Sequence, residues 1–212
     1  MGIFEWLLGE EPNPISQLLN YEDKGQFGEY LTDYILSKVK SYNRVLNNLY
    51  IPIGYGKTTE IDLVMIHKKG IFVIESKNYG GWIFGNLDQK QWTQCFPNRE
   101  KYRFYNPIMQ NRTHVNALSR QLNINKNCFF SYIVFSNRCE LKKIPDNSNE
   151  FEILKRSSLK YRLEELDYLN NRKEIFTPDQ INSLAEKLKP FTDVSEEVKR
   201  KHIEDIKKMQ NR

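Results

Sequence analysis

The sequence predicts an α/β protein in which a mixed sheet lies between helices. Apolar residues recur at helical spacing in Tyr21–Lys40, and again in a segment that begins at Asn106-Pro107. Four strand-like runs accompany these helices: Arg44–Ile51, Thr58–His67, Gly70–Lys77 and Phe129–Phe135. Because the chain runs helix, three strands, helix and strand, its helices can cover a shared sheet, as in the α/β class.

The first helix and the strands after it follow from local patterns. The helix opens at Gly25–Gly28, and its apolar stripe consists of Phe27, Leu31, Tyr34, Ile35 and Val39. The short turn His67–Gly70 ends in glycine and predicts a hairpin between the second and third strands. These two strands show little polar alternation, so we expect both faces of each to be covered.

Residues 78–105 are expected to be rich in loops, because Gly80-Gly81, Gly85-Asn86 and Pro97-Asn98 interrupt them. Within this stretch, Trp82–Phe84 and Gln91-Trp92 are predicted as short strands of an added ribbon. The next helix should begin with Asn106 as its cap and Pro107 in its first turn. Its apolar stripe consists of Ile108, Val115, Leu118 and Leu122.

The chain divides into three predicted parts: an N-terminal docking segment in residues 1–20, a core in 21–155 and a helical extension in 156–212. The apolar start of the first part docks on the domain or anchors it at a membrane surface. A short strand is predicted at Phe151–Leu154, before helices near Leu159–Leu169, Pro178–Leu188 and Glu196–Arg212. The last helix has a narrow apolar seam, so homo-oligomerisation through the C-terminal helices and a solvated helix both stay open.

Length and composition limit the class of protein. With 212 residues the chain can form one domain and an appendage. No apolar run approaches the roughly 20 residues that span a bilayer, so no membrane span is predicted. The three cysteines, Cys95, Cys128 and Cys139, form no paired metal-binding motif, so a structural zinc site is not expected. Reduced thiols and a cytoplasmic location fit this pattern better than disulfides.

Positive charge is concentrated in the middle of the chain. The net charge is +5, and residues 98–160 contain twelve Lys and Arg against five Asp and Glu. The segments on either side are nearly balanced or slightly acidic. Such a concentration suits a surface that binds a polyanion, although a solvated basic face without a partner has the same composition.

Two carboxylates and a lysine carry the predicted chemistry. Asp62 lies inside an apolar strand, where a charged residue is rare unless it is paired or binds a metal. Glu75 and Lys77 lie two residues apart near the end of the next strand, so they project from one face. Hairpin pairing can bring Asp62 beside Glu75, and two such carboxylates repel unless a cation lies between them. A simple Glu75–Lys77 surface pair would explain two of the three residues.

An all-oxygen site of this kind suits Mg²⁺, which needs one or two carboxylates plus water and a phosphate. Such a metal can polarise a phosphoryl oxygen and activate water. Lys77 would orient or deprotonate that water, or neutralise charge in the transition state. Glu29, in the first helix, is a candidate fourth member of the site.

The second predicted helix adds polar candidates. Gln110, Asn111 and His114 lie within about one helical turn of one another, and Gln110 and His114, four residues apart, share a face. Gln110 could hold the attacking water, Lys77 or a phosphate, whereas His114 is not favoured as a metal ligand. Trp82 and Trp92 could stack bases, but packing in the core or in a hairpin is the favoured role for both.

These residues occur in blocks that resemble the nuclease-related domain (NERD), a branch of the PD-(D/E)xK nuclease superfamily. The blocks cover roughly residues 22–136: Gly25-x-x-Gly-Glu29, Val45–Pro52, Thr59–Val64, Gly70–Tyr79, Gly81–Gly85, Gln91-Trp92, and Asn106–Asn111 with His114. One departure is Ser76, where the family more often has valine; its side chain is expected to face away from the site.

The resemblance implies a restriction-endonuclease-like αβββαβ core, an Mg²⁺-type site that Mn²⁺ could also fill, and cleavage of DNA. It carries over Asp62, Glu75, Lys77 and Glu29 as catalytic residues, the three acids as metal ligands, and Gln110 as a supporting residue. The alternative is a catalytically silent module that binds nucleic acid or a partner protein on the same fold. Endonuclease or exonuclease action, strand preference, RNA cleavage, sequence specificity and biological role are not written in the sequence.

Overall fold

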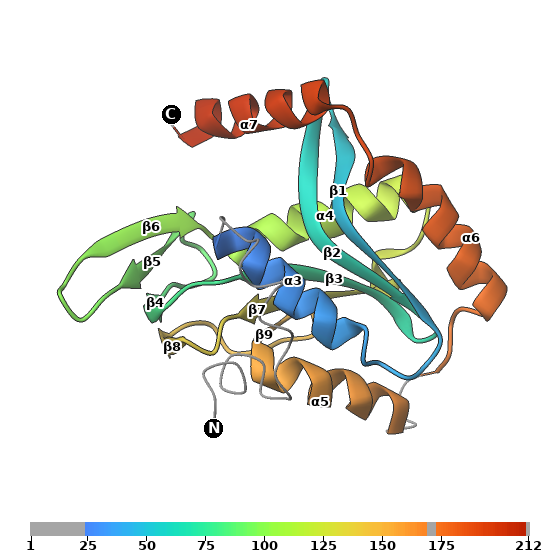
Figure 1. Cartoon of the computed structure of the whole chain (residues 1–212), viewed down its shortest axis with the longest axis horizontal. Helices are drawn as coiled ribbons and strands as arrows, with labels where there is room; N and C mark the ends of the chain where they lie inside the picture. The colour runs from blue at the N-terminus through green and yellow to red at the C-terminus, as the bar shows by residue number, and fades with distance from the viewer. Residues whose placement is uncertain (1–23, 169–172, 211–212) are drawn as a thin grey trace, which may run out of the picture.

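A five-stranded mixed sheet forms the centre of the computed structural model, which describes residues 24–168 and 173–210 (Figure 1). Its strands lie in the order β1-β2-β3-β7-β9, with β1, β2 and β3 antiparallel and β7 and β9 parallel to β3. The bounds are β1 Asn43–Gly54, β2 Lys57–His67, β3 Gly70–Lys77, β7 Phe129–Phe135 and β9 Phe151–Lys155. The predicted mixed sheet is confirmed, and the docking segment predicted in residues 1–20 lies outside the described residues.

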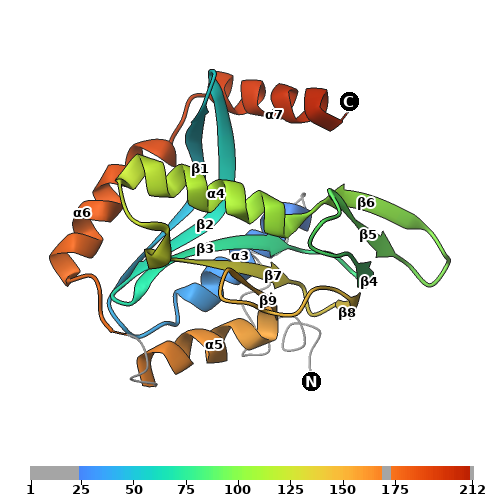
Figure 2. The same ribbon diagram turned by 180° about the vertical axis from the view of Figure 1, so that it is seen from behind.

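Helices cover both faces of this sheet, as the apolar strands predicted. The helices are α3 Lys24–Leu36, α4 Pro107–Leu122, α5 Arg156–Tyr168, α6 Pro178–Leu188 and α7 Glu196–Gln210, with 3₁₀ turns at Lys126–Cys128 and Lys189–Phe191. One core cluster joins apolar residues of α4 and α6 to one sheet face, and another joins α3 and α5 to the other face. Figure 2 shows α4 on the near side of the sheet and α3 behind it.

The junction before α4 follows the predicted pattern. The Asn106 side chain accepts a hydrogen bond from the backbone N–H of Ile108, and Pro107 occupies the first turn. The amide of Asn106 also donates to the carbonyl oxygens of Asn86, Leu87 and Gln89. Asn106 therefore both caps the helix and fixes the loop that precedes it.

The prediction of a loop-rich stretch at residues 78–105 was wrong in part, because this stretch contributes three strands to a second sheet. That sheet has the order β6-β5-β4-β8, with bounds β4 Gly81–Phe84, β5 Gln91–Cys95, β6 Lys101–Tyr105 and β8 Cys139–Lys143. Strands β4 and β5 extend the predicted ribbon, whereas β6 and β8 were not predicted. Trp92 is fully buried here, and its ring lies so close to Gly85 that a Cβ there would be 2.2 Å from it.

The C-terminal helices pack on the same sheet as the rest of the chain. The apolar side of α6 is buried in the core cluster that it shares with α4, through Ile181, Leu184, Ala185 and Leu188. Helix α7 contacts β2, where His202 Nδ1 lies 3.2 Å from Thr58 Oγ1. No helix within residues 24–168 and 173–210 is long and apolar enough to cross a membrane.

Candidate active site

The β2–β3 hairpin places Asp62 beside the end of β3. Leu63 pairs with Ile74, so the same register continued by one residue sets Asp62 opposite Glu75. The backbone N–H of Ser76 donates to Asp62 Oδ2 at 2.8 Å. This hydrogen bond joins the two strands just beyond the pair Leu63–Ile74, so it fixes the carboxylate at the open end of the hairpin.

Lys77 bridges Glu75 and Gln110. Its Nζ atom donates to Glu75 Oε1 at 2.5 Å and to Gln110 Oε1 at 3.2 Å. Glu75 is 1% exposed and Lys77 is 16% exposed at the side chain, so this is a buried ion pair rather than a surface pair. Helix α4 thus contacts the end of β3 through Gln110. Of the three partners predicted for Gln110 (water, Lys77 or a phosphate), the structure shows Lys77.

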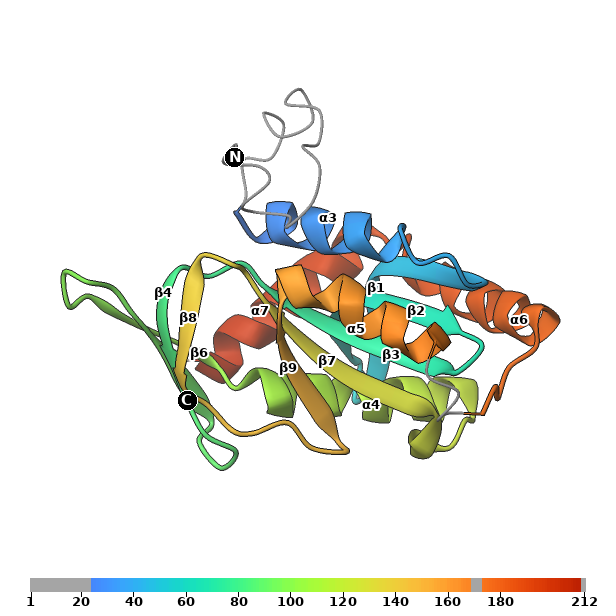
Figure 3. The same ribbon diagram turned by 90° about the horizontal axis from the view of Figure 1, so that it is seen from below.

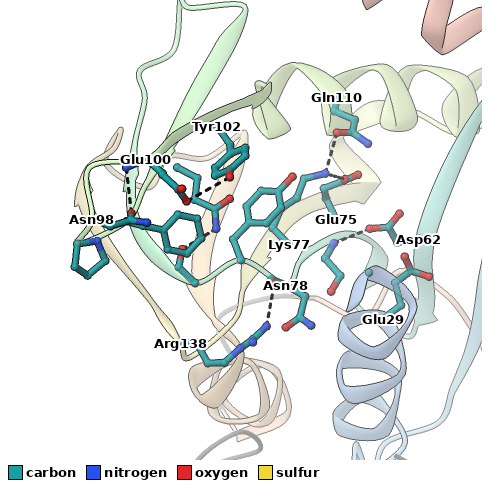
Figure 4. A pocket seen from close by; sticks show the side chains of 17 residues that line it. Glu29, Asp62, Glu75, Lys77, Asn78, Asn98, Glu100, Tyr102, Gln110 and Arg138 are labelled. Carbon is teal, nitrogen blue, oxygen red and sulfur yellow. Dashed lines mark hydrogen bonds and ion pairs between the residues drawn. The ribbon is translucent and has the colours of Figure 1, made fainter. Parts of the chain in front are cut away.

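All five predicted site residues line one cleft of about 930 Å³ (Figure 4). Glu29, Asp62, Glu75, Lys77 and Gln110 gather at one end of it. The other end is formed by β5, β6 and the loop between them, together with Arg138. The residues there are Gln94, Phe96, Pro97, Asn98, Glu100 and Tyr102. The cleft therefore joins an acidic, lysine-containing end to a polar and aromatic end.

The carboxylates at the acidic end have raised pKa values, and a bound cation would favour their ionised forms. Burial, and then repulsion by Glu75, raise the pKa of Asp62 well above its ordinary value. Burial also raises the pKa of Glu75, although Lys77 opposes this effect. For Lys77, burial favours the neutral amine, but Glu75 and Asp62 outweigh it and raise the pKa of the ammonium group. Lys77 is therefore a charged group at neutral pH.

His114 lies behind Glu75 rather than in the cleft. It is 1% exposed, and its Nδ1 atom is 3.5 Å from Glu75 Oε2 and 3.3 Å from Asn111 Oδ1. Burial, with Lys77 nearby, lowers the pKa of His114 to about 3, so the imidazole is neutral. Asn111 in turn donates to the carbonyl oxygen of Val73 in β3 at 2.9 Å. These two residues connect α4 to the strand that presents Glu75.

Trp82 and Trp92 have different surroundings. Trp92 is fully buried, which confirms packing as its role, whereas Trp82 in β4 is half-buried with Lys142 Nζ 5.9 Å from its ring centroid.

Ser76 agrees with the prediction in part. Its hydroxyl is 3.1 Å from Thr32 Oγ1 in α3, away from Lys77 and Glu75. Ser76 nevertheless contributes to the cleft lining, and its backbone holds Asp62.

Three polar residues near the site were not found from the sequence. Arg138 Nη2 donates to the carbonyl oxygen of Asn78 at 3.0 Å, and both residues line the cleft. Arg156 is fully buried; its Nη2 donates to Asn78 Oδ1 at 3.4 Å and its Nε to Thr32 Oγ1 at 3.3 Å. Burial lowers the pKa of Arg156 to about 10. The only local signal was the position of Asn78 directly after Lys77.

Within the described part of the chain, no three His, Cys, Asp or Glu side chains are grouped closely enough to form a metal site by themselves. Mg²⁺ keeps several waters and uses one or two carboxylates together with substrate phosphate. Asp62 and Glu75 therefore meet what this ion needs from a protein, while Glu29 lines the same end of the cleft.

Residues 24–136 match the nuclease-related domain, NERD, over more than half of the chain. The chain belongs to the NERD family. The match contains all five site residues and ends before Arg138 and Arg156, so those two arginines are supplied by the part of this NERD protein that follows the family region. Membership places the chain among nuclease-related proteins.

Two further comparisons extend beyond the family region. An uncharacterized protein of Bacillus anthracis, pXO1-01, is 32% identical over 182 residues, which are 85% of this chain and 82% of that protein. The likeness to this relative therefore includes part of the sequence outside the NERD match. A crystal structure titled as a protein of unknown function, AF1548, covers 90% of this chain and 100% of its own at 13% identity. Its TM-score of 0.35 is too low to carry an argument.

Proposed function

We propose that this NERD protein is a metal-dependent nuclease that hydrolyses DNA phosphodiester bonds. The observation that carries the proposal is the meeting of Asp62, Glu75 and Lys77 at one end of an open cleft. Glu75 is buried and Asp62 is half-buried, and two neighbouring carboxylates whose pKa values are raised are costly to keep without a cation. A binding module would not need them in this position.

The residues present fit a divalent ion such as Mg²⁺, with Mn²⁺ as an alternative. Glu29, Asp62 and Glu75 contribute three acidic groups to this end of the cleft, and Lys77 offsets one of their charges. Within the described residues, Glu75 Oε2 is buried without a hydrogen-bond partner, and His114 Nδ1 lies 3.5 Å from it. Asp62 and Glu75, with Glu29 beside them, would hold the ion, and it would polarise a phosphoryl oxygen and lower the pKa of bound water.

Lys77 is proposed to stabilise charge rather than to remove a proton. Its raised pKa keeps the ammonium form at neutral pH, and this form cannot act as a base. When water attacks phosphorus, its oxygen forms the new bond and the bond from phosphorus to the leaving oxygen breaks; the water gives up a proton to the surrounding solvent, and the leaving oxygen gains one. An ammonium group next to the phosphoryl oxygens would lower the energy of the negative charge that develops.

Gln110 is proposed as a positioning residue for Lys77. Its Oε1 atom accepts from Lys77 Nζ at 3.2 Å, which leaves the amide nitrogen of Gln110 able to donate toward water or phosphate. Because Gln110 comes from α4 and Lys77 from β3, the hydrogen bond holds the ammonium group between two elements. The expected role is geometric, with no proton transfer by Gln110.

DNA as partner and a cytoplasmic location are parts of the same proposal. Arg138 lines the cleft, and the basic segment 98–160 supplies β6 and β8 next to it. The cysteines that the described residues contain, Cys95, Cys128 and Cys139, are all free thiols, which agrees with a reducing compartment. Self-association through the C-terminal helices stays a prediction, although the apolar side of α6 is already buried on the sheet.

A cleavage assay tests the proposal. Purified protein is incubated with linear, circular and single-stranded DNA, in Mg²⁺, in Mn²⁺ and in chelator. Wild type should cut only with metal, and Lys77→Ala should lower the rate by about 10²–10³-fold, as loss of a charge-stabilising group does. Lys187→Ala, which removes an exposed lysine of α6, is the matched control and should cut like wild type. If wild type and Lys77→Ala give the same products in every lane, the proposal is wrong and the silent binding module replaces it.

A further inference from the structure

The second sheet has one covered face and one open face. Strand register assigns its residues: Ile83 pairs with Gln94 and Trp92 with Phe104, so these side chains share a face. Ile83, Trp92 and Phe104 belong to a core cluster with residues of β7 and β9. Figure 3 shows this sheet at one end of the molecule, with the rest of the described chain to one side of it. We call the opposite side the open face.

The open face combines aromatic rings with positive charges. By register it consists of Trp82 and Phe84 on β4, Gln91, Thr93 and Cys95 on β5, and Lys101, Arg103 and Tyr105 on β6. Phe84 is 36% exposed and Tyr105 is 43% exposed. At the β8 edge, Phe84 pairs with Lys143, and Lys142 Nζ lies 5.9 Å from the Trp82 ring centroid. Among the described residues of this face, the acidic one is Glu140, whose charge Lys142 offsets.

Phe84 and Tyr105 are exposed on this face, whereas Trp82 contacts Lys142 and Glu140 at the β8 edge. On the other face Trp92 is fully buried and Phe104 is partly buried, so those two rings pack in the core. Exposed rings between lysine and arginine are instead typical of surfaces that stack nucleic-acid bases while cations contact the phosphates. Such stacking needs unpaired bases, because in a duplex the base faces are already stacked on one another.

We propose that the open face binds a single-stranded segment of nucleic acid, with Phe84, Tyr105 and Trp82 stacking bases and Lys101 and Arg103 contacting phosphates. The identity of this polymer as DNA rests on the proposed function. The same ribbon lines the cleft on its other side, through Gln94 and Tyr102. A strand held on the open face is therefore gripped by the element that also borders the site of cleavage, and the protein would prefer substrates with a single-stranded tail.

Binding is measured in chelator, so that the result does not depend on cleavage. Fluorescence anisotropy follows a labelled oligothymidine of about 20 nucleotides, longer than the 4–16 nucleotides that one binding fold contacts. Wild type should bind the single strand more tightly than a duplex of equal length. Phe84→Ala and Tyr105→Ala should each weaken binding about 5-fold or more, the typical loss when one stacking ring is removed. Arg103→Gln should lower the slope of log affinity against log salt by about 0.7.

Controls distinguish this surface from general attraction. Tyr161→Ala removes an exposed ring from α5 (68% exposed), and Lys187→Gln removes an exposed cation from α6; both should bind like wild type. Heparin, a polyanion without bases, should bind Phe84→Ala as well as wild type. The inference is overturned if wild type binds no single strand, if duplex binds equally well, or if Phe84→Ala and Tyr105→Ala match their controls. Loss of cleavage in wild type with intact binding would contradict the proposed function alone.

Discussion

The two sheets of this protein differ in how they are covered: one carries the fixed acid–lysine site, and the other carries an exposed surface. The main sheet has helices on both faces, so the carboxylates and lysine at its edge are fixed by packing and hydrogen bonds. The second sheet is packed on one face and exposes rings and cations on the other. A reacting group needs fixed geometry. A strand-binding surface needs accessibility. The proposed cleavage site belongs to the sheet that is covered on both faces, and the proposed strand-binding surface is the open face of the second sheet.

The two tryptophans of the second sheet give the largest expected contrast. Trp92→Ala should lower the free energy of unfolding by about 3–5 kcal/mol, because it removes a fully buried ring and leaves a cavity. It also removes the hydrogen bond from Trp92 Nε1 to the carbonyl oxygen of Asn86. Trp82→Ala, on the open face, should cost about 1 kcal/mol. Urea denaturation followed by circular dichroism measures both, and equal losses would break the distinction between the two faces.

Buried His114, beside Glu75 on the main sheet, makes the stability of this sheet depend on pH. Its pKa is lowered to about 3, so the unfolded chain binds a proton more readily than the folded one between that value and about 6.5. The resulting stability is present above pH 6.5 and is lost as pH falls. The loss should be about 1.4 kcal/mol for each pH unit in this window. His114→Asn keeps a nitrogen near Nδ1 but cannot titrate, and should show a shallower loss in urea melts between pH 7.5 and pH 4.5. Parallel loss in both proteins would show that His114 is not the group responsible.

The main sheet and the acid–lysine set were predictable from the sequence because local patterns determine them. Continuous apolar runs gave β2 and β3, and counting from the turn placed Asp62 opposite Glu75. Strand β6 was predictable in principle, since Lys101 and Arg103 alternate with Tyr102 and Phe104, which is the period of a half-buried strand. Strand β8 carries no such pattern, because Cys139–Lys143 contains two consecutive lysines and one apolar residue of any size.

The surroundings of the site were not predictable, because long-range strand pairing brings them together. Arg138 and Arg156 follow β7 and β9, and reach Asn78 only because both strands run parallel to β3. No sequence pattern in residues 130–160 predicts that the guanidinium groups of Arg138 and Arg156 point toward the end of β3. The His114–Glu75 contact is similar: it depends on how α4 crosses the sheet, which helical periodicity does not give.

The central claim is that Asp62 and Glu75 together hold a divalent cation, and calorimetric titration with Mn²⁺ tests it most directly. Wild type should bind the ion, and Asp62→Asn should bind it at least about tenfold more weakly, as loss of a carboxylate ligand implies. The asparagine can still accept the hydrogen bond from Ser76, so the fold is kept and the charge alone is lost. Glu186→Gln, which removes an exposed acid of α6 outside the cleft lining, is the control and should bind like wild type. Equal Mn²⁺ affinity in wild type and Asp62→Asn would contradict the account.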